Sequence, residues 1–238
     1  MTRPVEHLVV VIPARDEERL LPRCLTAVET AIDRMRHEHP SVSVRLVVVV
    51  DRSTDGTLAV VHADPRVDAV VVVDHGNVGA ARHAGIAEAL VRSDHSTGAT
   101  WVATTDADSI VPPGWLVQHV MLADDGADAV IGTVTPEFEG LSDELVAGWL
   151  ATHKPGEANG HVHGANLGVR GSTYEQVGGF ASREVGEDVE LIARIAQGGW
   201  SVTSSGAMDV STSSRIVARA PHGYAAWLHG GGLLRTAT

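Results

Sequence analysis

The sequence predicts a single α/β domain in which a mostly parallel central sheet is flanked by helices. Its 238 residues are 44% hydrophobic and 20% charged, which suits one domain with a substantial core. Short β-branched apolar runs recur along the first half, and each is separated from the next by a segment long enough for a helix. These runs are continuously apolar, as burial on both faces of a parallel sheet requires.

Four strands and three helices are expected in the first half, in alternating order. The strands cover residues 8–12, 46–50, 70–73 and 101–105. Apolar side chains at three- and four-residue spacing predict the first helix between Leu20 and Met35, with the acids of residues 16–18 in its first turn, where the helix dipole favours negative charge. Asp55 and Asn77 are suited to open the second and third helices, the third ending near residue 91.

Beyond residue 110 the pattern is looser. Helices are expected near residues 115–122, 141–152 and 188–197, and a strand near 129–134. From Ser204 onward the chain is rich in serine, glycine and other small residues with little periodicity, so residues 204–238 are expected to form a partly mobile tail.

Composition excludes several classes of protein. A formal net charge of −12, with 18 Lys and Arg scattered along the chain, argues against nucleic acid as a partner. The single cysteine, Cys24, lies on an apolar helical stripe and is expected to be a buried thiol. The early apolar run at residues 8–12 is too short for a signal peptide or a membrane span, so we expect a cytoplasmic protein without a membrane span.

Polar clusters follow all four strands of the first half, at the edge of an open parallel sheet where ligands bind. The most informative is Asp106-Ala107-Asp108, after the fourth strand. Two carboxylates one residue apart at a strand end can turn toward a common hard cation, Mg²⁺ or Mn²⁺, and toward the diphosphate oxygens that it bridges. An isolated pair of this kind is weak support, because aspartates are common in turns; its place on the fourth strand strengthens it.

Five segments together resemble family 2 glycosyltransferases in order and approximate spacing. They are Pro-Ala-Arg-Asp-Glu at 13–17, Val-Asp-Arg-Ser-Thr-Asp-Gly-Thr at 50–57, Asn-Val-Gly-Ala-Ala-Arg at 77–82, Asp-Ala-Asp at 106–108 and Gly-Glu-Asp-Val-Glu-Leu at 186–191. The resemblance implies a glycosyltransferase A-type fold, a nucleotide-diphosphate-sugar donor (uridine diphosphate, UDP, favoured), a divalent metal, usually inversion at the anomeric carbon, and transfer of a hexose. It divides the single domain 1–238 into a nucleotide-binding half (1–110), an acceptor and catalytic half (111–203) and the tail.

The resemblance also assigns roles in the first half. Asp106 would approach the ribose or the metal, Asp108 would bind the metal, and Arg82 would steady the diphosphate, unless it is simply an arginine on the helix surface. Val50 stands where many members of the family carry the first of two aspartates. Residues expected to border the nucleotide base and ribose are Pro13, Ala14, Arg15, Glu17 and Asp51, with Asp51 accepting a hydrogen bond from the base.

In the second half a carboxylate across from the metal should accept the acceptor's proton, and Asp188, with Glu187 beside it, fits. From the residues alone, the favoured interpretation is that both cap the helix that follows. Late residues of the chain are assigned by the resemblance as well: His222 would complete the metal shell, and Arg215 and Arg219 would close over the diphosphate, although surface charge explains them nearly as well. Residues expected to line the donor sugar and acceptor are Gly164, Asn166 and His163; with His161, His163 forms an H-x-H pair that lacks a third zinc ligand at local spacing.

Other classes of protein fit less well. A sugar nucleotidyltransferase would resemble enzymes with a glycine-rich basic first loop, and an oxidoreductase would need G-x-G-x-x-G after the first strand; the chain has neither. Retention of Asp106, Asp108 and Asp188 argues against an inactive nucleotide-sugar-binding homologue. The Gln-x-x-Arg-Trp motif of processive synthases is also missing, which favours a single transfer. We expect a small-molecule acceptor. The sequence does not determine the oligomeric state.

Overall fold

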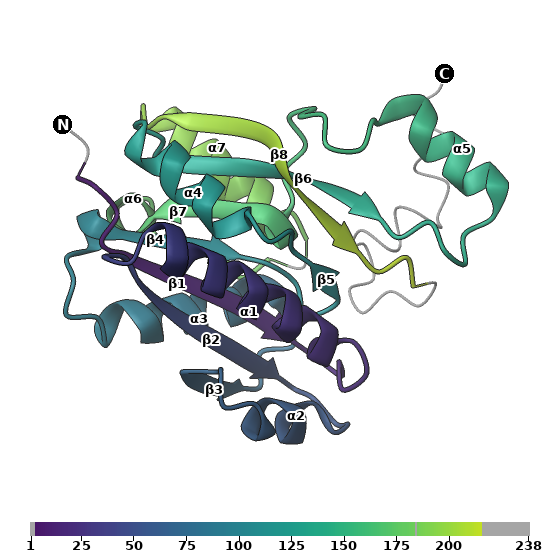
Figure 1. The fold of residues 1–238 in the computed structure, drawn as a ribbon, viewed down its shortest axis with the longest axis horizontal. Coiled ribbons are helices and arrows are strands. Elements are labelled where there is room, and N and C mark those ends of the chain that lie inside the picture. The colour runs from purple at the N-terminus through teal and green to yellow at the C-terminus, as the bar shows by residue number, and fades with distance from the viewer. Residues whose placement is uncertain (1–2, 184, 216–238) are drawn as a thin grey trace.

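A computed structural model describes residues 3–183 and 185–215 of the chain (Figure 1). In this part eight strands form one sheet in the order β3-β2-β1-β4-β7-β6-β8-β5. Four of the seven neighbouring strand pairs are parallel and three are antiparallel. The predicted α/β class with a mostly parallel sheet is therefore confirmed.

The first half alternates strand and helix as predicted. Each expected strand coincides with an observed one to within a few residues, and Asn77 caps the third helix by accepting a hydrogen bond from the N–H of Ala80. The elements are β1 (His7–Ala14), α1 (Leu21–Glu38), β2 (Ser43–Asp51), α2 (Thr57–Ala63), β3 (Ala69–Val73), α3 (Val78–Val91) and β4 (Thr100–Thr104).

The second half contains the expected helices and strand together with short elements that the pattern did not predict. A four-residue strand and a six-residue helix, β7 and α6, are too short to show a period. The elements are β5 (Ser109–Ile110), α4 (Trp115–Asp124), β6 (Ala129–Pro136), α5 (Asp143–Thr152), β7 (Leu167–Arg170), α6 (Gly171–Gln176), α7 (Glu187–Gln197) and β8 (Val202–Thr212).

The prediction of a partly mobile tail from residue 204 is wrong for residues 204–212, because these residues belong to β8. This strand pairs parallel with β6 and antiparallel with β5. Its buried side chains, Met208, Val210 and Thr212, alternate with less buried ones, which is the period of a strand with one face on the core. Residues 216–238, with His222 and Arg219, lie outside the described residues.

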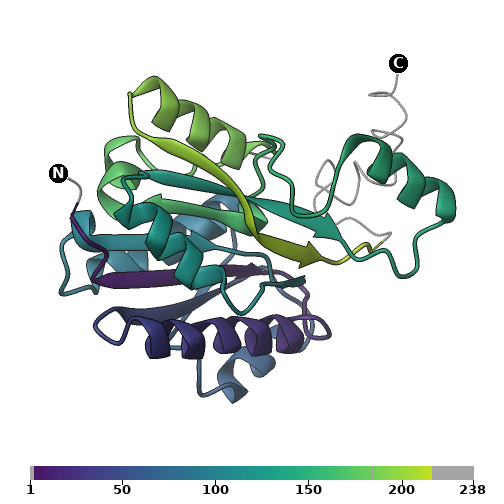
Figure 2. The same cartoon turned by 45° about the horizontal axis from the view of Figure 1, so that its top comes forward.

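Helices cover both faces of the sheet (Figures 1 and 2). Leu8, Val10 and Ile12 of β1 belong to a core cluster shared with α1 and α4, whereas Val9 and Val11 belong to a second cluster shared with α3, α6 and α7. Cys24 lies fully buried in the first cluster, as expected. The continuous apolar character of β1 is thus explained by burial on both sides.

One helix stands apart from these layers. Figures 1 and 2 show α5 carried beyond the end of β6, away from the rest of the domain. Trp149 of α5 packs with Phe138 and Leu141 in a small separate cluster. Among the described residues, no helix is long and apolar enough to span a membrane.

Candidate active site

The loops that follow β1 and β2 are joined to each other by hydrogen bonds. Thr54 donates its backbone N–H to Oδ1 of Asp16 at 2.7 Å, and Gly56 donates to Oε2 of Glu18 at 2.7 Å. In the other direction, side-chain oxygens of the second loop accept the N–H groups of the first: Asp16 donates to Ser53, Glu17 to Thr57 and Glu18 to Asp55. Sequence reasoning placed these polar residues at one edge of the sheet but did not predict that they bind one another.

The expectation that residues 16–18 form the first turn of α1 is wrong. Asp16 has a positive φ of 51°, which a helix cannot contain, and α1 begins only at Leu21 with Pro22 in its first turn. The N–H groups of residues 16–18 are used by the loop after β2 instead of pointing along a helix axis. These acids therefore lie in the loop at the carboxyl edge of the sheet.

The predicted nucleotide-binding segment spans the end of β1 and the loop that follows. Pro13 and Ala14 are the last two residues of β1 and both are buried, and their contact with the nucleotide stays a prediction. The loop begins at Arg15, which is half-buried. Glu17, another predicted nucleotide contact, is also buried, and its carboxylate binds Arg215.

Asp51 has a structural role that differs from the one expected. It ends β2, is buried, and accepts the backbone N–H groups of His75, Gly76 and Asn77 at 2.7, 2.8 and 2.9 Å. Oδ1 accepts two of these N–H groups and Oδ2 accepts one. Asp51 therefore holds the loop that leads into α3, and its expected hydrogen bond to a nucleotide base stays a prediction.

Arg82 connects the two halves of the site. Only 3% of its side chain is exposed, which excludes the interpretation as a surface arginine of α3. Its guanidinium binds Oδ1 of Asp106, after β4, and Oε1 of Glu187, in α7, each at 2.6 Å. Gly164 lies against it so closely that an added β-carbon would be 2.4 Å from Cζ of Arg82. A glycine at position 164 thus lets the chain pass over this buried charge cluster.

The two predicted catalytic carboxylates have different environments. Glu187 is buried; burial raises its pKa, and the neighbouring charge of Arg82 opposes that rise. Asp188 is half-buried, and its Oδ2 accepts the backbone N–H of Gly164 at 2.7 Å. Glu187 is bound to Arg82, and Asp188 is the more exposed member of the pair.

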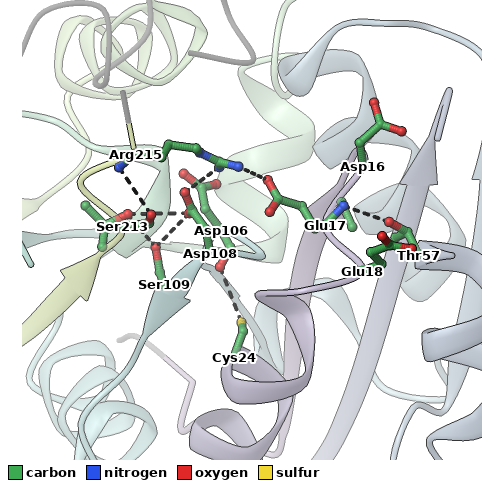
Figure 3. Close-up of polar contacts among 12 residues, drawn as sticks. Asp16, Glu17, Glu18, Cys24, Thr57, Asp106, Asp108, Ser109, Ser213 and Arg215 are labelled. Carbon is green, nitrogen blue, oxygen red and sulfur yellow. Dashed lines mark hydrogen bonds and ion pairs between the residues drawn. The ribbon is translucent and has the colours of Figure 1, made fainter. Parts of the chain in front are cut away.

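The Asp106-Ala107-Asp108 segment lies at the carboxyl edge of the sheet, between β4 and β5 (Figure 3). Asp106 keeps 35% of its side chain exposed while binding Arg82. Asp108 is buried and forms an ion pair with Arg215, which also binds Oε1 of Glu17 at 2.6 Å. Burial raises the pKa of Asp108, and Arg215 partly offsets this.

The carboxylates of Asp106 and Asp108 are chemically suited to bind the expected metal. Carboxylate oxygens are the ligands that Mg²⁺ and Mn²⁺ prefer, and diphosphate oxygens and water can fill the other positions. Within residues 3–183 and 185–215 no group of three His, Cys, Asp or Glu side chains is arranged to hold an ion. The third ligand expected from the sequence, His222, lies outside this part.

Asn166 lies inside the domain, and its expected contact with the donor sugar or acceptor stays a prediction. It is fully buried, its Oδ1 accepts from Trp115 Nε1 at 2.9 Å, and its amide nitrogen donates to the carbonyls of Thr133 and Met208. A β-carbon at Gly132 would lie 2.2 Å from the same amide. Asn166 therefore positions the turn at Gly164 by joining α4, β6 and β8.

The histidines of this region form a row. His163 is half-buried, and burial lowers its pKa although the negative charge of Asp188 opposes this. Nε2 of His153 lies 3.3 Å from Nδ1 of His161, so a third histidine does stand beside the H-x-H pair. Sequence reasoning missed His153 because it lies eight residues before His161, at the end of α5. The chain turns after α5, and this turn brings the two histidines together.

The fold and the site together define an α/β transferase that binds a nucleotide sugar. An acidic pair stands at the end of the central strand β4, a second acidic pair opens α7, and one buried arginine joins them. The chain belongs to glycosyl transferase family 2, whose family model matches residues 9–160.

Relatives and solved structures agree with this. The chain is 29% identical to an uncharacterised glycosyltransferase of Mycobacterium bovis, over 88% of this chain and 87% of that protein. It is 31% identical to the undecaprenyl-phosphate 4-deoxy-4-formamido-L-arabinose transferase of Pseudomonas syringae over 55% of this chain, and it spans 36% of that protein's length. The structure resembles a mannosyltransferase of Pyrobaculum calidifontis solved with GDP-mannose and Mn²⁺, with a TM-score of 0.63, 22% identity, and coverage of 98% of this chain and 65% of that one.

Proposed function

We propose that this glycosyltransferase moves one hexose from a nucleoside-diphosphate sugar, with UDP as the favoured nucleotide, to a hydroxyl of a small-molecule acceptor. The observation that carries the proposal is the buried bridge from Asp106 through Arg82 to Glu187. This bridge connects the end of β4 to the start of α7, which supports a donor site at the first and a proton-accepting site at the second.

Asp106 and Asp108 would hold Mg²⁺ or Mn²⁺, which when bound neutralises the charge that develops on the diphosphate leaving group. The mannosyltransferase of similar fold was solved with Mn²⁺, which supports this choice of ion. Arg15, which is half-buried and the first residue after β1, would border the nucleotide.

Asp188 would accept the proton of the acceptor hydroxyl as that oxygen attacks the anomeric carbon, so that a single displacement inverts the configuration. The N–H of Gly164 fixes its Oδ2, and its own helix fixes Oδ1 through the N–H of Val189 at 2.8 Å. The carboxylate is therefore oriented before the substrate arrives. His163, beside it, would contact the acceptor or the donor sugar.

Thermal denaturation with UDP, GDP and thymidine diphosphate, each with and without Mn²⁺, tests the proposal. At a concentration about 100-fold above Kd, a ligand that binds the folded state adds about 2.7 kcal/mol of stability, or roughly 5–10 °C in Tm for a domain of this size. The metal-dependent part of the shift should be lost in D108N and kept in the control D125N, which changes an exposed aspartate at the end of α4 in the same way. No shift with any diphosphate, or an equal shift in EDTA, would contradict the proposal.

A further inference from the structure

We propose that Arg215 is an internal counter-ion that competes with the divalent cation for Asp108, so that the cation binds tightly only together with a nucleoside diphosphate. This inference rests on the proposed function. It concerns how the binding of the metal and the binding of the nucleotide depend on each other, and it is argued from the contacts of Arg215.

Arg215 bridges two carboxylates that come from different loops. Its Nη1 lies 2.6 Å from Oε1 of Glu17, after β1, and its Nη2 binds Oδ2 of Asp108, after β4 (Figure 3). The side chains of Glu17 and Asp108 are 6% and 9% exposed, whereas that of Arg215 is 23% exposed. Two buried carboxylates close together would repel each other strongly without a cation, so the guanidinium supplies the charge that this pocket requires.

The remaining contacts of Asp108 are weak. Its Oδ1 accepts from the hydroxyls of Ser109 and Thr212, both at 3.4 Å. A metal ion that binds Asp108 must therefore displace the guanidinium from Oδ2 or share the carboxylate with it, and two cations sharing one small buried carboxylate repel each other. Metal binding in the absence of a nucleotide is thus opposed by Arg215.

The two arginines of the site differ in how they are held. Arg82 lies inside α3 and is buried, with Asp106 and Glu187 on either side, so it is fixed. Arg215 follows the end of β8 by three residues, outside regular secondary structure, and keeps part of its side chain exposed. Of the two, Arg215 is the one that can change partners without unfolding a helix.

A diphosphate removes the competition. Its oxygens present paired acceptors that match the two N–H groups of a guanidinium, so Arg215 can move from Asp108 to the phosphates while the metal takes its place on Asp108. The carboxylate of Asp108 is paired with a cation before and after this exchange. Because each ligand then favours the other, the affinities of metal and nucleotide are coupled, and the coupling is reciprocal.

The test measures Mn²⁺ binding alone by electron paramagnetic resonance, and UDP binding at saturating Mn²⁺ by calorimetry, in wild type and R215Q. R215Q should bind Mn²⁺ alone about tenfold more tightly and UDP about tenfold more weakly, as expected for exchanging one charge-assisted hydrogen-bonded pair. R66Q is the matched control, since Arg66 also bridges two carboxylates, Asp64 and Glu29, with similar exposure at another place; it should change neither affinity.

R215K keeps the charge but cannot span both carboxylates, so it should fall between wild type and R215Q in both measurements, and it replaces R215Q if that variant does not fold. Unchanged Mn²⁺ affinity in R215Q and R215K, or tighter Mn²⁺ binding without weaker UDP binding, overturns the counter-ion role while the proposed function stands. If wild type binds no nucleoside diphosphate at all, the proposed function fails instead, and the measurement with Mn²⁺ alone still decides whether Arg215 competes with the metal.

Discussion

His119 is a fully buried ionisable side chain in α4. Its ring lies edge-on to Trp115, with centroids 5.1 Å apart, and near Trp101 at 6.2 Å. Neither ring nitrogen has a hydrogen-bond partner among the described residues. Burial without a partner lowers the pKa of His119 from 6.5 to about 3.

This pKa shift predicts that acid destabilises the fold. The folded pKa lies below the unfolded value, so below pH 6.5 the unfolded chain binds a proton that the folded protein does not, and stability falls with pH until about pH 3. Applying the two pKa values gives a loss of about 2 kcal/mol in the free energy of unfolding between pH 7.5 and pH 5 from this residue. Above pH 6.5 its contribution is constant.

Urea denaturation of wild type and H119Q at both pH values measures this loss. Glutamine does not titrate, so the difference in unfolding free energy between the two proteins should shift by about 2 kcal/mol in favour of H119Q as the pH falls from 7.5 to 5. Other histidines affect both proteins equally and cancel. Parallel pH dependences for the two proteins would refute the reasoning.

Three further predictions concern the site and the core. D188N should lower turnover about 10²–10⁴-fold with little change in UDP affinity, as measured by product formation and calorimetry, and near-wild-type turnover would remove Asp188 as the base. R82Q leaves its two carboxylate partners without their cation and should lower the free energy of unfolding by about 3–5 kcal/mol in urea, a loss under about 1 kcal/mol being inconsistent with the bridge. G85A places a β-carbon 2.5 Å from Cγ2 of Val49 and should cost about 1–3 kcal/mol in the same assay, whereas G98A, with its nearest neighbour at 3.9 Å, should be close to neutral; equal effects would show that α3 can shift away from the sheet.

The local patterns that predicted the first half are properties of short segments. Residues 8–12 and 46–50 are apolar at every position, and a segment buried on both sides must be so whatever its neighbours are. Asn77 could be placed at a helix start because its side chain satisfies an N–H three residues away. The acidic pair after β4 could be placed at the ligand edge because parallel strands end together.

Interactions between distant segments could not be predicted in this way. β8 looked irregular because its alternation is interrupted by serine and glycine, and its pairing with β6 and β5 decides that it is a strand. Asp51 and Asn166 were expected to contact ligands, but Asp51 accepts N–H groups of the loop before α3, and Asn166 binds the indole of Trp115 and the carbonyls of Thr133 and Met208. A polar side chain at the carboxyl edge of a sheet can bind either a ligand or a neighbouring loop. The residue and its neighbours in the sequence are the same in both cases.

The sequence by itself determined the family, the order of strands and helices in the first half, and the residue types that gather at one edge of the sheet, because periodicity and motif spacing are local. Tertiary structure decided which of those residues remain available for chemistry. It buried Glu187 against Arg82, left Asp188 half-buried, and paired Asp108 with Arg215. The physical reason is that burial and charge pairing depend on segments as far apart as Asp108 and Arg215, which only the folded chain brings together.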